Sequence, residues 1–347
     1  MQRPVMNPNF YEETPSSPRR ARRRPLKALI NLFWRGTKAF FRLLRYDPLA
    51  RIPGFRMEEG TPTSRFIRGL LYRMAFVPVF IAATACAIVW TSTHPRNVVT
   101  EIDPASQGIY YEAVTFLGAD DIRIEGWLMP VIDAHTVLQE KERVLWTRRP
   151  AVVLIHDLGQ RKDSMLPLIK PLHDAGYVVL AINLRGGGPQ ALAGETFGVQ
   201  ESIDVKAAVE MLRRRPFVDS GRVALVGFGT GASAALLAAQ ADPQIVAVVA
   251  HQPMNDANDV VKNLIVPQNR YLSWMAPLCK WTFEMSYGVD IDELQMSNFR
   301  KVFDTRHVMM VAPTTGYADI ADPKNVETIK GFLEANVPPS NALAGAK

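Results

Sequence analysis

The feature that most constrains this chain is a run of 17 residues without a charge, Met74–Trp90 (MAFVPVFIAATACAIVW). Together with Leu70–Tyr72 it approaches the roughly 20 residues that a helix needs to cross the hydrocarbon core of a bilayer. Arginines flank its amino-terminal side, and the long side chain of Arg73 can reach the headgroups. Because the apolar spacing is not amphipathic, a core helix of a soluble protein fits less well. The pattern predicts a transmembrane helix over residues 70–92.

Charge is divided unevenly between the two sides of this segment. Residues 1–73 carry 16 Lys and Arg against 5 Asp and Glu, a net charge of +11, whereas the remainder carries 24 against 29 and has a net charge of −5. Because basic flanks stay on the cytoplasmic side, we expect a single-pass protein of the inner or plasma membrane with a cytoplasmic amino terminus. The rest of the chain would then be periplasmic or extracellular. A cleaved signal peptide would need a charged leader of over 70 residues, so the segment is interpreted as an uncleaved signal anchor.

The basic segment before the anchor has two parts. Residues 1–25 are polar, rich in proline and end in PRRARRRP, which predicts a disordered basic arm. Residues 26–69 begin with Leu26–Tyr46, where apolar residues recur at helical spacing among five cations, and continue as a linker. This pattern suits a helix in the interface of an anionic leaflet, although a helix packed on a protein of a membrane complex fits it too. The adjacent anchor favours these partners over nucleic acid.

Residues 98–337 predict an α/β domain. Val114–Leu117 and Ile122–Met129 form an expected hairpin. Short apolar strands then alternate with helical segments, which predicts a mostly parallel sheet covered by helices on both faces. Residues 252–300 interrupt the alternation and predict a helical cap, and residues 338–347 predict a flexible tail. The remaining expected strands are 151–155, 178–182, 223–226, 245–250 and 307–312, and the expected helices are 165–175, 203–214, one from residue 231, and 325–335.

The segment Val223–Gly231 (VALVGFGTG) leads from a strand into a helix, and at this point the chain resembles the α/β-hydrolase superfamily, in its peptidase-like and esterase-like branch. The resemblance runs from about Val114 to Leu333 and implies the α/β-hydrolase fold. The order and spacing of its motifs along the chain are together more specific than any single motif. The other motifs that carry it are GWLMP in the hairpin, Ile155–Gly159 (IHDLG), Asn183–Gly188 (NLRGGG) and Phe197–Asp204 (FGVQESID).

In that family the strand–turn–helix reads G-x-S-x-G and presents a serine nucleophile. The middle position here is Gly229, which suits a strained turn but carries no nucleophile. Thr230 follows the turn and would lend its backbone N–H to an oxyanion hole, together with the loop residues His156, Asp157 and Leu158. Ser233 lies within the helix. Neither hydroxyl stands at the nucleophile position, so the resemblance implies a degenerate triad.

The general base is missing as well. The resemblance places a histidine after glycine on the loop that follows the final strand, but the sequence has Gly316-Tyr317 there and no histidine after His307. The position of the catalytic acid depends on which strand of the family residues 307–312 are aligned with. If residues 307–312 form the final strand, the strand that carries the acid is missing. If they are the acid strand, Asp319 is the candidate acid and the last strand is absent.

The sequence gives little support for a dinucleotide, metal or other cofactor site. The glycines at 186–188 do not fit a dinucleotide fingerprint, no cluster has metal-ligand spacing, and we predict neither cofactor nor metal. Two cysteines, Cys86 and Cys279, exclude a disulfide scaffold. The first hypothesis is therefore a membrane-anchored pseudoenzyme that acts as a binding or assembly module. The alternatives are an active esterase or peptidase with relocated catalytic residues and a non-hydrolytic enzyme that reuses the pocket.

Overall fold

The computed structural model divides into two compact units, residues 1–80 and residues 81–347. The basic arm, the expected interfacial helix and most of the expected tail lie outside the described residues. The loop with Tyr317 and Asp319 lies outside them too. The structure describes residues 62–95, 102–118, 121–131, 147–186, 193–254, 256–265, 271–311, 320 and 322–339.

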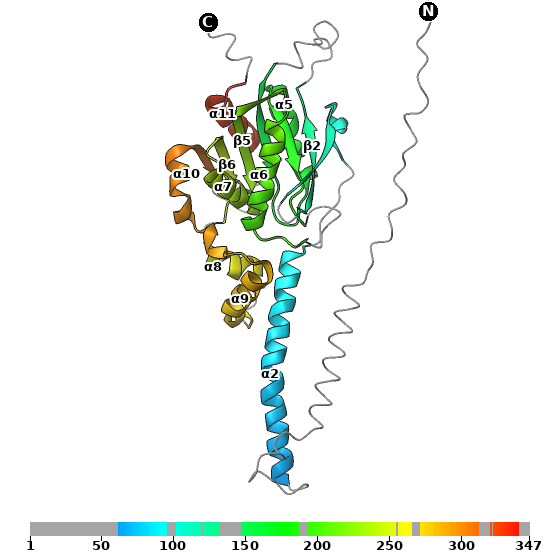
Figure 1. Ribbon diagram of the computed structural model, residues 1–347, viewed down its shortest axis with the longest axis vertical. Helices are drawn as coiled ribbons and strands as arrows, with labels where there is room; N and C mark the ends of the chain where they lie inside the picture. Colours follow the sequence, from blue (N-terminus) through cyan, green and yellow to red (C-terminus); the bar gives the residue numbers. More distant parts are fainter. Residues whose placement is uncertain are drawn as a thin grey trace, which may run out of the picture. The chain divides into compact units, whose positions relative to one another are not determined.

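A seven-stranded sheet forms the centre of the larger unit, in the order β1-β2-β4-β3-β5-β6-β7 (Figure 1). The hairpin pair and the contact of β2 with β4 are antiparallel, and the other contacts are parallel. The predicted mostly parallel sheet is confirmed. The strands are β1 (Glu112–Leu117), β2 (Arg123–Met129), β3 (Arg149–Ile155), β4 (Val178–Ile182), β5 (Val218–Phe228), β6 (Ile245–His251) and β7 (His307–Val311).

Helices cover both faces of the sheet because the strand side chains alternate between two apolar clusters. In β3, Val153 and Ile155 face the cluster of α6, α7 and α10, whereas Val152 and Leu154 face the cluster of α5 and α11. Burial on both faces explains why this strand is apolar throughout. The helices of these two layers are α5 (Leu166–Asp174), α6 (Val199–Arg213), α7 (Thr230–Ala241), α10 (Arg300–Thr305) and α11 (Pro323–Asn336), with two 3₁₀ turns, η3 (Pro104–Gln107) and η5 (Lys162–Met165).

The expected cap consists of short helical elements between β6 and α10. A third buried cluster joins them to the loop before α6, where Phe197 lies 5.3 Å from Phe283, measured between ring centroids. These elements are α8 (Ala257–Val260), the π-helix η7 (Val261–Ile265), η8 (Ser273–Met275), α9 (Ala276–Tyr287), η9 (Ile291–Leu294) and η10 (Met296–Phe299).

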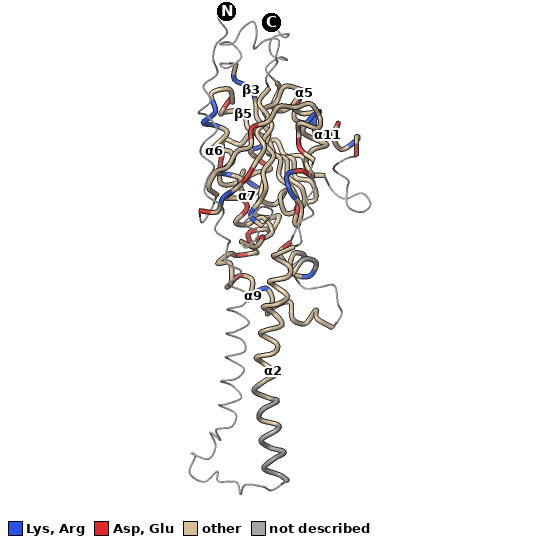
Figure 2. Tube along the Cα trace, turned by 90° about the vertical axis from the view of Figure 1, so that its right-hand side faces the viewer, with Lys and Arg blue, Asp and Glu red and all other residues tan. Residues whose placement is uncertain are grey.

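The expected anchor is one helix, α2 (Pro62–Thr93), which starts earlier than residue 70. Its stretch Phe76–Thr93 is long and apolar enough to cross a membrane, and it contains no Lys, Arg, Asp or Glu, as the tan part of α2 in Figure 2 shows. The last turns of α2 belong to the larger unit, because Ala85, Ile88 and Val89 at i, i+3 and i+4 are buried in the cap cluster. The larger unit therefore begins before the expected boundary at residue 98.

The strand β7 is the edge of the sheet, next to β6. Helix α11 then crosses to the layer of α5, and the hydroxyl of Tyr177 donates to the carbonyl of Val337 at 2.9 Å. In the described part of the chain, β7 is the one strand after β6. Residues 307–312 can be aligned with the acid strand or with the final strand of the family, and each alignment expects one strand here, so the observation fits both.

Candidate functional site

The turn between β5 and α7 has the strained backbone of a nucleophile elbow. Gly229 at its apex has φ 53° and ψ −116°, a conformation that a residue with a side chain adopts only under strain. Its N–H donates to the carbonyl of His251 at 2.9 Å, which fixes the apex against the end of β6. A Cβ at Gly231 would overlap the carbonyl of His156, so this glycine lets the elbow approach the end of β3.

The carboxylate of Asp157 fills the space above this apex. A Cβ built at Gly229 would overlap the Oδ1, Cγ and Oδ2 atoms of Asp157. Asp157 Oδ1 accepts the backbone N–H of Leu158 at 2.7 Å and that of Thr230 at 2.8 Å, and the Thr230 hydroxyl donates to it at 3.3 Å. The two amides expected to bind an oxyanion therefore bind an anion of the chain itself. The site is occupied by its own carboxylate.

His156 connects the neighbouring loops and points away from the apex. Its Nε2 accepts the N–H of Leu184 at 3.0 Å, so the proton lies on Nδ1, which donates to the carbonyl of Asp157 at 2.8 Å. The ring is fully buried, and burial lowers its pKa to about 4. His156 is thus a neutral, structural histidine that holds the loop of Asp157.

The two hydroxyls near the apex are both engaged. Ser233 is fully buried, and its Oγ accepts the N–H of Met254 at 2.9 Å. Thr230 is 1% exposed and donates to the Asp157 carboxylate. No imidazole lies within hydrogen-bonding distance of either hydroxyl in the described part of the chain, so the carboxylate of Asp157 is the one basic group that a hydroxyl there contacts.

His251 is the other histidine at this edge of the sheet. It ends β6, is 2% exposed, and its ring lies 4.9 Å from the ring of Phe228. Burial lowers its pKa, and its Nε2 has no hydrogen-bond partner among the described residues. It packs beside the elbow and activates no hydroxyl there.

A buried ion pair stabilises the arginine–glycine turn next to the site. Arg185 binds Asp204 with two hydrogen bonds, Nε to Oδ2 at 2.8 Å and Nη2 to Oδ1 at 2.9 Å, and both side chains are buried. Glu201 accepts the N–H groups of Thr196 at 2.7 Å and Gly198 at 2.9 Å, which caps α6. Asp204, three residues further along α6, instead neutralises Arg185.

The carboxyl-terminal end of α2 reaches the same loops. The carbonyl of Thr93 accepts the N–H of Glu195 at 2.7 Å, and Glu195 Oε1 accepts the N–H of Gly159 at 3.3 Å. Glu195 is 1% exposed, and this burial raises its pKa well above the ordinary value. The space beside the Gly159 Cα is filled by the Pro95 ring, and Leu158 packs on the cap cluster. Pro95 and Leu158 thus connect the loop of Asp157 to the end of α2 and to the cap.

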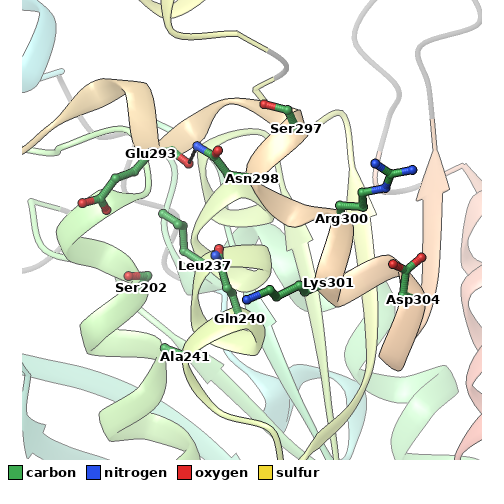
Figure 3. A pocket seen from close by; sticks show the side chains of 10 residues that line it. All are labelled: Ser202, Leu237, Gln240, Ala241, Glu293, Ser297, Asn298, Arg300, Lys301 and Asp304. Atoms are coloured by element: carbon green, nitrogen blue, oxygen red, sulfur yellow. Dashed lines mark hydrogen bonds between the residues drawn. The ribbon is translucent and has the colours of Figure 1, made fainter.

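In the described part of the chain, an open cavity lies away from the elbow. It has a volume of about 730 Å³ and lies between α6, α7 and the segment from η9 to α10 (Figure 3). Most of its lining residues are polar or charged and exposed, and none of them is an elbow residue. Its ten residues are Ser202, Leu237, Gln240, Ala241, Glu293, Ser297, Asn298, Arg300, Lys301 and Asp304. Within the described ranges, no group of three or more His, Cys, Asp or Glu could hold a metal ion.

The strand order and the glycine elbow define the α/β-hydrolase fold, with a mostly parallel sheet between layers of helices. Residues 134–269 match the family model described as the Dienelactone hydrolase family, which supports this assignment. A comparison with curated proteins found no match.

Several solved structures are similar to this chain. An esterase from Pyrococcus furiosus is 18% identical, with 70% of this chain and 99% of that chain covered and a TM-score of 0.48. An acetyl xylan esterase from Paenibacillus is 16% identical, with 74% and 93% covered and a TM-score of 0.49. An acylaminoacyl peptidase from Pyrococcus horikoshii is 12% identical, with 66% and 42% covered and a TM-score of 0.41.

Proposed function

We propose that this protein is a membrane-anchored pseudoenzyme with the α/β-hydrolase fold, and that it acts as a binding or assembly module. The observation that carries the proposal is the position of Asp157, whose carboxylate takes the space of a nucleophile at Gly229 and the amides of an oxyanion hole.

Ester or peptide hydrolysis by this fold needs a nucleophile, a base that activates it and donors that stabilise the developing oxyanion. Gly229 has no side chain, and Tyr317 stands in the sequence where the resemblance places the base. Asp157 already accepts the hydrogen bonds of both donors, and its negative charge would repel an oxyanion. Loss of the nucleophile or base alone costs about 10⁶ in rate in the best-studied triad. We therefore expect no hydrolysis at enzymatic rates.

The membrane part of the proposal rests on the apolar stretch of α2 and on the basic residues that precede it. The basic arm would contact an anionic cytoplasmic leaflet or a protein of a membrane complex, while the folded domain would bind a partner on the other side. A fusion of alkaline phosphatase after residue 100 should be active in a Gram-negative host. An inactive phosphatase together with an active cytoplasmic reporter at the same point would reverse this orientation.

A second candidate function is ester hydrolysis with a relocated nucleophile. The match to the Dienelactone hydrolase family favours it, and the Thr230 hydroxyl next to the Asp157 carboxylate is the group that could serve.

A fluorophosphonate probe and an activated-ester assay on the detergent-solubilised full chain separate these two functions. We expect no labelling and no turnover above a heat-denatured sample, with an active serine esterase as positive control. The matched variants are Thr230→Val and Ser233→Ala. Labelling of the wild type that Thr230→Val abolishes, together with ordinary turnover, would establish the relocated nucleophile and end the pseudoenzyme proposal.

A further inference from the structure

A row of large apolar side chains on the cap is exposed. Trp274, Pro277, Trp281 and Met285 follow one another at intervals of three, four and four residues, so they lie along one face of α9 and the turn before it. Trp274 is 61% exposed, Trp281 58% and Met285 68%, and Tyr271 one turn earlier is 82% exposed. We call these five residues the α9 face.

The other sides of α9 contact the rest of the cap. Cys279 and Phe283 are buried in the cap cluster. Lys280 forms an ion pair with Asp292 at 2.7 Å and lies 3.7 Å from Glu284, so its charge is neutralised within the cap. The α9 face itself carries no charged residue. Five uncharged residues on one exposed side, three of them aromatic, need an apolar or amphipathic environment.

The inner side of α9 packs on the end of the apolar helix α2. Ala85, Ile88 and Val89 are buried in the same cluster as Phe283, and the hydroxyls of Thr93 and Tyr287 lie 2.7 Å apart. The cap is therefore fixed to the last two turns of the segment that is apolar enough to cross a membrane.

This contact determines how deep the cap lies if α2 spans a bilayer. The apolar stretch Leu70–Trp90 is about as long as the roughly 30 Å hydrocarbon core is thick, at about 1.5 Å per residue. Ala85, five residues before its end, then lies about 7 Å inside the hydrocarbon boundary. Elements that pack on Ala85 and Val89 cannot remain in bulk water above the membrane, because those positions are at the depth of the outer interface.

We propose that the α9 face lies in the outer interface of the bilayer, so that the cap is a second, monotopic membrane contact beside the helical anchor. Trp and Tyr are the side chains enriched at this depth, and Trp90 at the end of the apolar stretch is also 51% exposed. The proposal rests on the membrane anchoring in the proposed function. A second copy of the chain could also cover an apolar face, whereas the segment Leu26–Tyr46 would lie on the other side of the bilayer. A face at the depth of Ala85 contacts lipid without any further partner.

Spin labels on the reconstituted full chain test this placement. Single cysteines are introduced at Trp281 and Met285 after Cys86 and Cys279 are replaced by alanine, and circular dichroism checks the fold. Collision with oxygen, which concentrates in lipid, is compared with collision with a water-soluble nickel chelate. Two control positions are Phe80 in α2, 61% exposed, and Tyr110, 66% exposed, which precedes β1 at the opposite edge of the sheet from the cap.

We expect labels at 281 and 285 to resemble the label at 80, with at least about three times more oxygen contact relative to nickel contact than at 110. Nickel contact equal to that at 110 would place the face in water and overturn the inference. Low contact with both reagents would show a protein cover and overturn it as well. Strong nickel contact at position 80 would instead contradict the membrane anchor in the proposed function. Lipid contact at position 80 together with water contact at position 281 would contradict the further inference alone.

Discussion

The elbow and the α9 face are two places where a protein of this fold could meet a ligand, and they differ in how their surfaces are satisfied. At the elbow, Asp157, Thr230 and Ser233 are hydrogen-bonded to one another or to backbone groups, and Pro95 and Leu158 pack on neighbouring parts of the chain. On the α9 face, large apolar side chains are exposed. Under the proposed binding role, this difference favours contact through the exposed surface over contact through the pocket of the fold.

The difference also has an electrostatic side. A hydrolase keeps two backbone amides free for a charge that exists only in the transition state. Here the Asp157 carboxylate occupies both amides, so these hydrogen bonds stabilise the folded protein and not a transition state. The three predictions that follow test this comparison, from the largest expected effect to the smallest.

The largest effect is expected when a side chain is returned to the apex. In Gly229→Ser the new Cβ overlaps the Asp157 carboxylate, which must leave its hydrogen bonds to Leu158 and Thr230, and serine must adopt the strained backbone. Lost charged hydrogen bonds and backbone strain together predict a loss of roughly 3–5 kcal/mol in the free energy of unfolding. Chemical denaturation of the full chain in detergent measures it.

Two controls separate the causes of this loss. Gly108 has φ 75°, and a Cβ added there would meet open space. Gly108→Ser therefore reports positive-φ strain alone and should lower the free energy of unfolding by about 1–2 kcal/mol. Asp157→Ala removes the overlap, so the double variant with Gly229→Ser should be more stable than the two single losses predict, by about 1–3 kcal/mol. Additive losses would mean that Asp157 does not occupy the apex.

The second prediction uses the buried His156. Its pKa in the fold is about 4, compared with an ordinary value of 6.5. Above pH 6.5 the ring is neutral in both states and has no effect. As the pH falls from 6.5 to 4 the unfolded chain takes up a proton and the folded chain does not, so stability should fall by about 3 kcal/mol.

The matched control for this titration is His156→Gln, whose amide oxygen can accept the Leu184 N–H. Glu195, whose buried carboxyl has a raised pKa, favours the folded state as the pH falls and opposes the effect of His156. It is present in both proteins, so the difference between their stability curves isolates His156. A difference that does not change between pH 6.5 and 4 would show that the ring is protonated in the fold.

Much of the fold could be predicted from the sequence because its signals are local. Buried parallel strands such as Val178–Ile182 are apolar throughout, and the prediction of this strand is confirmed with the same bounds. The boundary of the domain was harder to predict. Ala85 and Val89 are as apolar as their neighbours in α2, and only the folded cap distinguishes the residues that it buries.

The site could be predicted in part. The glycine at 229 is visible in the motif, and so is the absence of a histidine after residue 307. The position of Asp157 could not be predicted, because its neighbour at the apex is 72 residues away along the chain and the contact depends on the close approach of two loops. One signal was available: an acid in the oxyanion loop, combined with a missing side chain at the apex, leaves a space that the acid can fill.

The smallest effect is expected on the α9 face. A side chain that contacts only lipid or detergent contributes little to the packing of the fold, so Trp281→Ser and Met285→Ser should each change the free energy of unfolding in detergent by no more than about 0.5 kcal/mol. The buried neighbour Phe283 is the matched control, since Phe283→Ala opens a cavity in the cap cluster and should cost about 3–5 kcal/mol. A loss above about 2 kcal/mol for Trp281→Ser would mean that the ring packs on protein, as it would in a contact with a second copy of the chain. In that case the α9 face would be covered by protein, as the elbow is, and would not lie in lipid.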